Sequence, residues 1–187
     1  TFHPDSDYST FVGAYKPTNN KEVRYGLNGS NTIAYKDPND NSRELTESKI
    51  EYRFIKQAFL KAYINAWKLF SASSDMDNIE KQFLVIEEIN RGNCAQIFGD
   101  LFQLLDRKYG FSEYPIEADE DIRKALLDID TTENPSFGKD GLQLSDEKRE
   151  FINAIFNKDN DEDSPYRDVA SEIASGKVLV LPCNLYI

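Results

Sequence analysis

The sequence predicts an α/β fold in which apolar strands alternate with helices. FLVI, at residues 83–86, is a continuous apolar run, which is typical of a strand covered on both faces. A short polar turn and an apolar, helix-like segment at residues 94–107 follow it. A second apolar run, VLVLPCNLYI at residues 178–187, is interrupted by Pro182. Strand, turn and helix in this order favour a βα unit, the building block of parallel sheets.

Composition indicates one globular domain. The chain has 187 residues, 40% of them hydrophobic and 12% aromatic, which is enough for a sizeable core. Its net charge of −11 argues against a general nucleic-acid binder, because phosphates would be repelled. No apolar run reaches the roughly 18 residues of a membrane-spanning helix, so we expect no membrane contact. Cys94 and Cys183 are interpreted as reduced thiols of a cytoplasmic protein.

The N-terminal half predicts a hairpin and a long helix. NGSN at residues 28–31 lies between β-type residues, so a β-hairpin is expected near residues 23–35. Ser48 with Glu51 fits a capping box, and apolar residues from 50 to 70 recur with a helical period. A long amphipathic helix with one broad buried face is therefore predicted there.

The C-terminal half predicts a short strand at FSEYPI, residues 111–116, and a helical insertion at residues 118–176. This insertion is a candidate partner surface, and a solvated lid is the alternative. Three helices are expected within it. Their signals are the apolar residues at 122–126, the cap residue Ser145, the Ser164-Pro165 start and the Gly176 stop.

Two adjacent carboxylates, Glu87 and Glu88, end the apolar run at residues 83–86. Like charges side by side repel, and burying them unpaired is costly, so a cation is expected nearby. The pair would lie at the carboxyl end of a strand, which is the edge where open α/β sheets bind their ligands.

Four interpretations compete for this pair. The first is a solvated helix start, where the helix N-terminus favours negative charge. The second is a magnesium-dependent nuclease site that would need further acids, although the spacing of Asp100 and Asp106 does not point back to the pair. The third is a P-loop NTPase, in which one acid holds Mg²⁺ and the other activates the attacking water. The fourth keeps that fold as a nucleotide-sensing or assembly module without turnover.

The longer string FLVIEEINRGNCAQIFGDLFQLLDR, residues 83–107, closely resembles the Walker B region of the McrB-type AAA+ proteins. This family includes the motor subunit of the modified-cytosine restriction system and related AAA-domain proteins. TFHPDSDYSTFVGAYKP at the start is similar to the family's segment after the P-loop helix, and SEYPI and LPCNLYI resemble its later strands. Residues 118–176 match only loosely. The resemblance implies that residues 1–187 form a single partial AAA+ P-loop NTPase domain, with strands 2–4 of its parallel sheet.

The resemblance also implies a role for each polar residue after the strand. Glu87 occupies the position of the magnesium-binding acid, which acts through water, and Glu88 that of the catalytic glutamate. The commoner AAA+ pair is Asp-Glu, so Glu87 is one methylene longer. Asn90 and Arg91 would face the nucleotide or a neighbouring subunit; an ion pair with a nearby acid is the alternative for Arg91. Asn93 completes the motif and is the predicted N-cap of the helix. The implied cofactor is Mg²⁺ with ATP or GTP.

The implied partners are further copies of the chain in a ring, expected to be hexameric, and a McrC-like nuclease subunit, with DNA bound through other domains. An assembly or interaction module without nucleotide turnover is the alternative. The phosphate-binding pattern G-x-x-x-x-G-K-[ST] does not occur in the chain, so we expect it upstream of Thr1, with the family's sensor segment after Ile187. The chain starts at Thr1 and its one methionine is Met76, as expected for part of a longer protein. Alone, these 187 residues are expected neither to hydrolyse nucleotide nor to bind it more tightly than millimolar.

Overall fold

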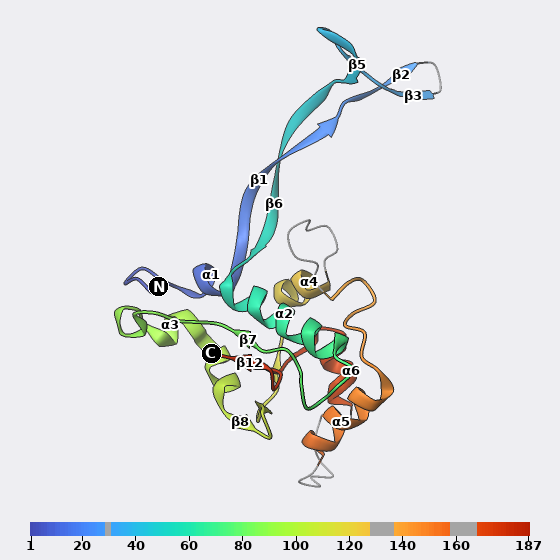
Figure 1. Cartoon of the computed structure of the whole chain (residues 1–187). Helices are drawn as coiled ribbons and strands as arrows, with labels where there is room; N and C mark the ends of the chain where they lie inside the picture. The colour runs from blue at the N-terminus through green and yellow to red at the C-terminus, as the bar shows by residue number, and fades with distance from the viewer. Residues whose placement is uncertain (29–30, 128–136, 158–167) are drawn as a thin grey trace. The chain divides into compact units, whose positions relative to one another are not determined.

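The computed structural model describes residues 1–28, 31–127, 137–157 and 168–187, which form two compact units (Figure 1). The main unit comprises residues 1–13 and 56–187, and the ribbon unit comprises residues 14–55. The sequence indicated a single domain, whereas the contacts of the folded chain separate these two parts. Among the described residues, no helix combines the length and the apolar character needed to cross a membrane.

Helix α2, Ala58–Ala72, is the centre of the main unit. Eight of its fifteen residues are buried, which matches the broad apolar face that the sequence predicts. Trp67 Nε1 donates a hydrogen bond to the carbonyl of Val180 at 2.9 Å, and Asn184 Nδ2 donates to the carbonyl of Ala66 at 3.0 Å. These bonds fix the C-terminal segment to α2. The aromatic rings that α2 contributes to the core are those of Phe59, Tyr63, Trp67 and Phe70.

The predicted start of this helix is wrong. Residues 46–56 form strand β6, Thr46–Lys56, so Ser48 and Glu51 make no capping box, and α2 begins after Gln57. The segment IEYRF also alternates apolar and charged residues, a pattern that suits a strand as well as a helix over so short a stretch. Pairing with strand β1, Gly13–Val23, decides between the two.

The described residues of the main unit form three short strand pairs, and one of them is parallel. Strand β7, Gln82–Phe83, pairs in parallel with β12, Leu185–Tyr186, in the register Leu185 to Gln82. The other two pairs are antiparallel: β8, Arg107–Lys108, with β9, Phe111–Ser112, and β10, Ile116–Glu117, with β11, Val178–Leu179. The predicted strand at 111–116 is therefore divided between β9 and β10.

The apolar run at residues 83–86 is not covered on both faces, so that prediction is wrong. Phe83 is 61% exposed and Val85 is 78% exposed. Only Gln82 and Phe83 of this region are in strand geometry. The apolar side chains instead line an open groove, which is described below with the acidic pair.

The single helix predicted over residues 94–107 is also broken in two. Helix α3, Cys94–Phe98, ends at Gly99, whose φ of +53° interrupts the helix. A 3₁₀ helix, η2, then spans Gly99–Leu105. In η2, Phe102 is exposed, while Leu101 and Leu104 are buried.

The described part of the insertion at residues 118–176 belongs to the main unit, and its residues Ile122, Ile152 and Ile173 are buried. It contains α4, Glu120–Leu127, α5, Asp146–Phe156, and α6, Val169–Ala174. Ser145 caps α5, and Gly176 follows the end of α6, both in the predicted positions. Asp168 caps α6, and the predicted start at Ser164-Pro165 lies outside the described residues. A short helix, α1, Tyr8–Phe11, completes the main unit.

Lysine side chains connect this insertion to its neighbours. Lys148 of α5 is buried, and its Nζ donates hydrogen bonds to the carbonyls of Ser71 and Ser73 at the C-terminal end of α2. Lys56 Nζ donates to the carbonyl of Ala125 in α4 at 3.3 Å. A cation at a helix C-terminus also interacts favourably with the helix dipole.

Replacing Lys148 with methionine is expected to lower the free energy of unfolding by about 1.5–3 kcal/mol, because two carbonyls lose a charged donor. Urea denaturation followed by the fluorescence of Trp67, the one tryptophan, measures this change. Lys139, which is exposed, provides the control Lys139→Met. Equal stability of the two variants would show that the Lys148 bonds contribute nothing.

The hairpin of β8 and β9 has an unusual turn. Its two central residues, Tyr109 and Gly110, both have positive φ, +52° and +88°. Such turns favour Asn-Gly or Asp-Gly, and a tyrosine in this conformation is strained. Tyr109→Asn is therefore expected to raise the free energy of unfolding by about 0.5–1 kcal/mol, a gain within reach of urea denaturation. A loss of stability would mean that contacts of the tyrosine ring outweigh the strain.

The ribbon unit is built from β1 and β6, which run alongside each other (Figure 1). Two hairpins connect the end of β1 at Val23 to the start of β6 at Thr46. Strands β2, Tyr25–Asn28, and β3, Asn31–Ala34, form the hairpin predicted near residues 23–35, with Asn28 opposite Asn31. Strands β4, Lys36–Asp37, and β5, Asp40–Glu44, form the second hairpin.

Candidate functional site

The acidic pair lies just beyond strand β7, in the turn that leads to helix α3. Glu87 is exposed, and the Thr1 hydroxyl donates a 2.6 Å hydrogen bond to its Oε2. The backbone also joins these segments, since the amide of Phe2 donates to the carbonyl of Glu87 at 2.9 Å. Residues 1–2 and the β7 segment are therefore neighbours at the site.

Glu88 has a backbone conformation that glutamate rarely adopts. Its φ of +57° and ψ of +42° are left-handed, and it immediately precedes the 3₁₀ helix η1, Ile89–Arg91. The carbonyl of Glu88 accepts a hydrogen bond from the amide of Arg91 at 2.9 Å, which closes this turn. Strained conformations of this kind cost about 1–3 kcal/mol and cluster at functional sites. The carboxylate itself is exposed to solvent.

This exposure answers the charge problem that the sequence raises. Among the described residues, no basic side chain forms an ion pair with Glu87 or Glu88, so the expected neighbouring cation is not found there. Water screens two exposed charges well enough for the pair to persist without one. Arg91 is exposed too, and its guanidinium pairs with no acid in the described parts of the chain.

The remaining residues of the motif follow in order. Asn90 lies in η1 and is exposed. Asn93 is the N-cap of α3, and its side-chain oxygen accepts a hydrogen bond from the amide of Gln96 at 3.3 Å. The turn and the cap together keep the four polar residues Glu87, Glu88, Asn90 and Arg91 at one end of β7.

The acidic pair suits an Mg²⁺ site with one or two protein carboxylates better than a site built from three or more protein ligands. Within the described residues, no three Asp, Glu, His or Cys side chains group to hold a metal ion, so Asp100 and Asp106 do not complete a site with the pair. Mg²⁺ commonly uses only one or two carboxylates and takes its other oxygens from substrate phosphates and water. The exposed carboxylate of Glu87 fits an Mg²⁺ site of this kind.

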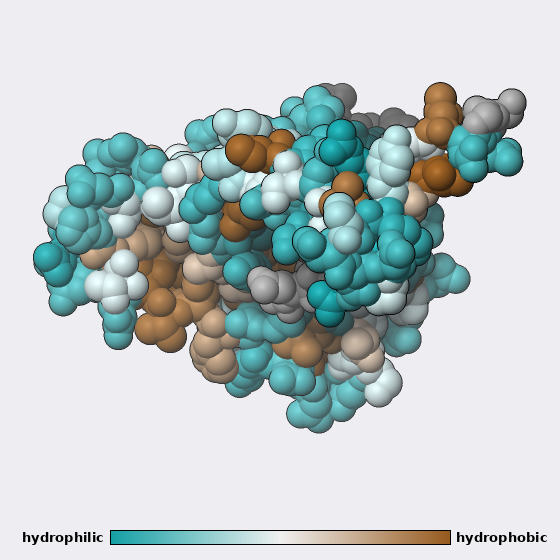
Figure 2. Space-filling model, turned by 90° about the horizontal axis from the view of Figure 1, so that it is seen from above, coloured by the Kyte–Doolittle hydropathy of each residue, from teal (hydrophilic) through white to brown (hydrophobic). Residues whose placement is uncertain are grey.

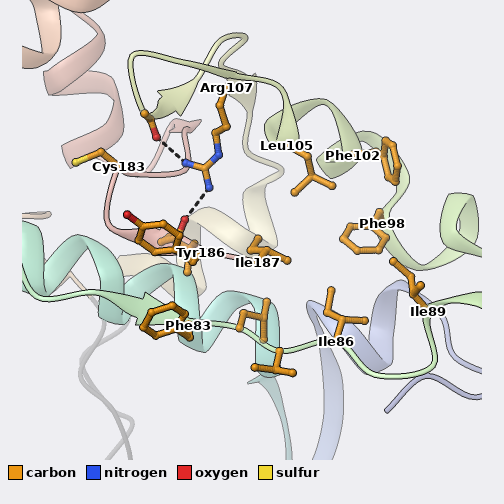
Figure 3. A pocket seen from close by; sticks show the side chains of 14 residues that line it. Phe83, Ile86, Ile89, Phe98, Phe102, Leu105, Arg107, Cys183, Tyr186 and Ile187 are labelled. Atoms are coloured by element: carbon orange, nitrogen blue, oxygen red, sulfur yellow. Dashed lines mark hydrogen bonds between the residues drawn. The ribbon is translucent and has the colours of Figure 1, made fainter.

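An apolar groove of about 850 Å³ lies beside the acidic pair (Figure 3). Ile86 and Ile89, which flank the pair in sequence, both line it. Figure 3 shows apolar side chains facing the groove from β7, from the region of α3 and η2, and from the C-terminal residues. Sequence reasoning missed this feature, because an apolar run does not reveal which of its faces stays open. The other principal lining residues are Phe83, Val85, Phe98, Phe102, Leu105, Tyr186 and Ile187.

Arg107 holds one end of this groove together. Its guanidinium donates hydrogen bonds to four backbone carbonyls, those of Gly110, Leu181, Pro182 and Leu185, at 2.9–3.3 Å. Figure 3 draws the bonds to Gly110 and Leu185. Because it binds the loop that leads into β12, it fixes the strand that pairs with β7.

Burial lowers the pKa of Arg107, but the guanidinium stays charged at any physiological pH. Burial also raises the pKa of the nearby Cys183 thiol, against the opposing effect of the Arg107 charge. Cys183 is therefore a neutral thiol, and the charged guanidinium of Arg107 is hydrogen-bonded to the backbone carbonyls.

Comparison with known proteins relates the chain to a restriction system. It is 39% identical over 127 residues to the type II restriction enzyme BsuMI component YdiS of Bacillus subtilis (strain 168). The matched region is 67% of this chain but 34% of YdiS, so the chain spans about a third of the length of this relative. No family model matches the chain, and no solved structure does. A component of a restriction system is thus a relative of this protein.

Proposed function

We propose that this chain is the Walker B segment of a McrB-like AAA+ nucleoside triphosphatase, the ring motor of a DNA restriction or phage-defence system. The observation that carries the proposal is the exposed pair Glu87-Glu88, which follows the carboxyl end of β7 after the three residues 84–86; β7 pairs in parallel with β12. The similarity to a restriction enzyme component supports the biological setting.

The arrangement of neighbouring segments supports the proposed fold. The β7 segment is joined by backbone hydrogen bonds both to the Asn184–Tyr186 segment and to Phe2. In the AAA+ interpretation the β7 segment is strand 3 of the core sheet, the Asn184–Tyr186 segment is strand 4 and the segment of Phe2 is strand 2. Ligands of such sheets bind at the carboxyl ends of the strands, and the acidic pair is located at that end of β7.

Each polar residue has a task in this proposal. The carboxylate of Glu88 orients the attacking water and accepts its proton, and exposure leaves it free to do so. Glu87 would hold Mg²⁺ through water, and the ion would neutralise the phosphate charge of bound ATP or GTP. Asn90 and Arg91 would face the nucleotide or a neighbouring subunit. A nuclease subunit and DNA-binding domains would complete the system.

The experiment is phosphate release by the full-length protein that contains this segment, measured with ATP and with GTP in the presence of Mg²⁺. We expect turnover with at least one nucleotide, together with nucleotide-dependent assembly seen by sedimentation velocity. The isolated 187 residues are expected to show neither. A full-length protein that hydrolyses neither nucleotide would contradict the proposal.

A further inference from the structure

The ribbon unit has one apolar and one charged face. In β6, Ile50, Tyr52 and Phe54 alternate with charged residues, so these three side chains lie on the same side of the strand. The ring of Tyr15 from β1 meets the ring of Phe54 edge to face, with the centroids 5.6 Å apart, and therefore lies on this side too. We call Tyr15, Ile50, Tyr52 and Phe54 the apolar ribbon face.

The charges of the opposite side are paired within the ribbon. Arg53 Nη2 lies 3.0 Å from Glu51 Oε2, and Lys49 Nζ lies 3.2 Å from Glu22 Oε2. Lys49 also approaches Glu51 at 3.8 Å. Opposite charges on this face thus neutralise one another, and none of these groups needs a charged partner from outside.

Exposure is the reverse of what this pattern leads one to expect. Ile50 and Tyr52 are each 71% exposed, whereas the side chain of Glu51 on the other face is only 27% exposed. Regular apolar–polar alternation is typical of a strand with one buried face. A two-stranded ribbon has no second layer to bury that face and is marginally stable alone. Apolar side chains also gather in patches on the otherwise hydrophilic surface of Figure 2.

Charge decides which kind of molecule covers the apolar ribbon face. Residues 14–55 hold 7 of the 22 basic and 6 of the 33 acidic residues, which leaves 15 basic and 27 acidic residues in the rest of the chain. A nucleic acid requires several cations on the contact face, but Lys49 and Arg53 lie on the opposite face and are paired. The alternation of β1 and β6 puts one lysine, Lys21, on the side of Tyr15. Two copies of a chain with net charge −11 repel each other, and the nearly neutral ribbon is where they can meet at least cost.

We propose that the apolar ribbon face packs against the same face of a second copy of this chain. An apolar face is complementary to itself, so the contact can be isologous, with each copy supplying the same residues. Strands of eleven residues are about 36 Å long, which makes the paired area smaller than a standard protein interface. The contact is therefore weak and concentration-dependent. It requires no nucleotide, so its test is separate from that of the proposed hydrolysis.

Sedimentation equilibrium of the 187-residue chain between about 1 and 500 µM tests the proposal. We expect reversible dimers, and at least a tenfold weaker association for Ile50→Glu and Tyr52→Glu, since each buries a charge in the contact. Val85→Glu is the control, because Val85 is as exposed as these residues but belongs to the groove of the main unit. Circular dichroism verifies that each variant is folded.

A crosslinking experiment gives an independent result. In a background with Cys94→Ser and Cys183→Ser, a short bismaleimide should join two Tyr52→Cys chains, but not two Lys49→Cys chains, which carry the thiol on the charged face. A monomer at every concentration would overturn the proposal. Association that Val85→Glu abolishes and Tyr52→Glu leaves unchanged would overturn it as well.

Discussion

Replacing Glu88 with glutamine in the full-length protein is expected to reduce nucleotide hydrolysis by about 10²–10⁴-fold. Glutamine has nearly the same shape, so the left-handed turn at this position and the adjacent helix η1 should be kept. It cannot accept the proton of the attacking water, and this is the step that the proposal assigns to Glu88. Nucleotide binding should change little, because the phosphates are held by other groups.

Phosphate release under saturating ATP or GTP measures the effect, and equilibrium binding of a fluorescent nucleotide verifies that the site is intact. Glu117, an exposed carboxylate at the end of β10, provides the control Glu117→Gln, which should retain full activity. Equal rates for the wild-type protein and Glu88→Gln would support an assembly module without turnover.

Replacing Trp67 with alanine is expected to cause the largest loss of stability in the main unit. Trp67 is fully buried and contacts the rings of Phe70 and Phe111. Truncating a buried tryptophan costs about 3–5 kcal/mol, and the carbonyl of Val180 loses its donor as well. Since small domains are stable by only about 5–15 kcal/mol, the variant should be mostly or partly unfolded at 37 °C.

Urea denaturation followed by far-ultraviolet circular dichroism measures this loss, because the variant has no tryptophan fluorescence. Trp67→Phe should cost about 1–3 kcal/mol, since it keeps an aromatic ring but loses the hydrogen bond to Val180. Leu27→Ala, at an exposed position of the ribbon unit, should change stability by less than about 0.5 kcal/mol. A Trp67→Ala chain as stable as this control would show that the residue is not central to the core.

Structural features that depend only on neighbouring residues could be predicted from the sequence. The cap at Asn93, the cap at Ser145 and the NGSN hairpin turn all occur at their predicted positions. The two caps depend on a side chain that hydrogen-bonds to the backbone three residues away, and the hairpin depends on a short polar segment between two β-type runs. The acidic pair after an apolar run is a signal of the same local kind.

Structural features that depend on a segment far away in the sequence could not be predicted from it. IEYRF fits both a helix and a strand, and β1 decides its structure by pairing with it. The apolar run at 83–86 reveals hydrophobicity but not which face the rest of the chain covers, so the exposure of Phe83 and Val85 could not be foreseen.

The sequence by itself thus determined that the chain contains both helices and strands, the caps at Asn93 and Ser145, and the hairpin of β2 and β3. Only the tertiary structure decided that the ribbon is separate from the main unit, that the insertion packs against α2 through Lys148, and that a groove opens beside the acids. The physical reason is the range of the interactions. Caps and turns are settled within a few residues, whereas pairing and burial depend on segments about 30 to more than 100 residues apart, such as Thr18 and Glu51, or Trp67 and Val180.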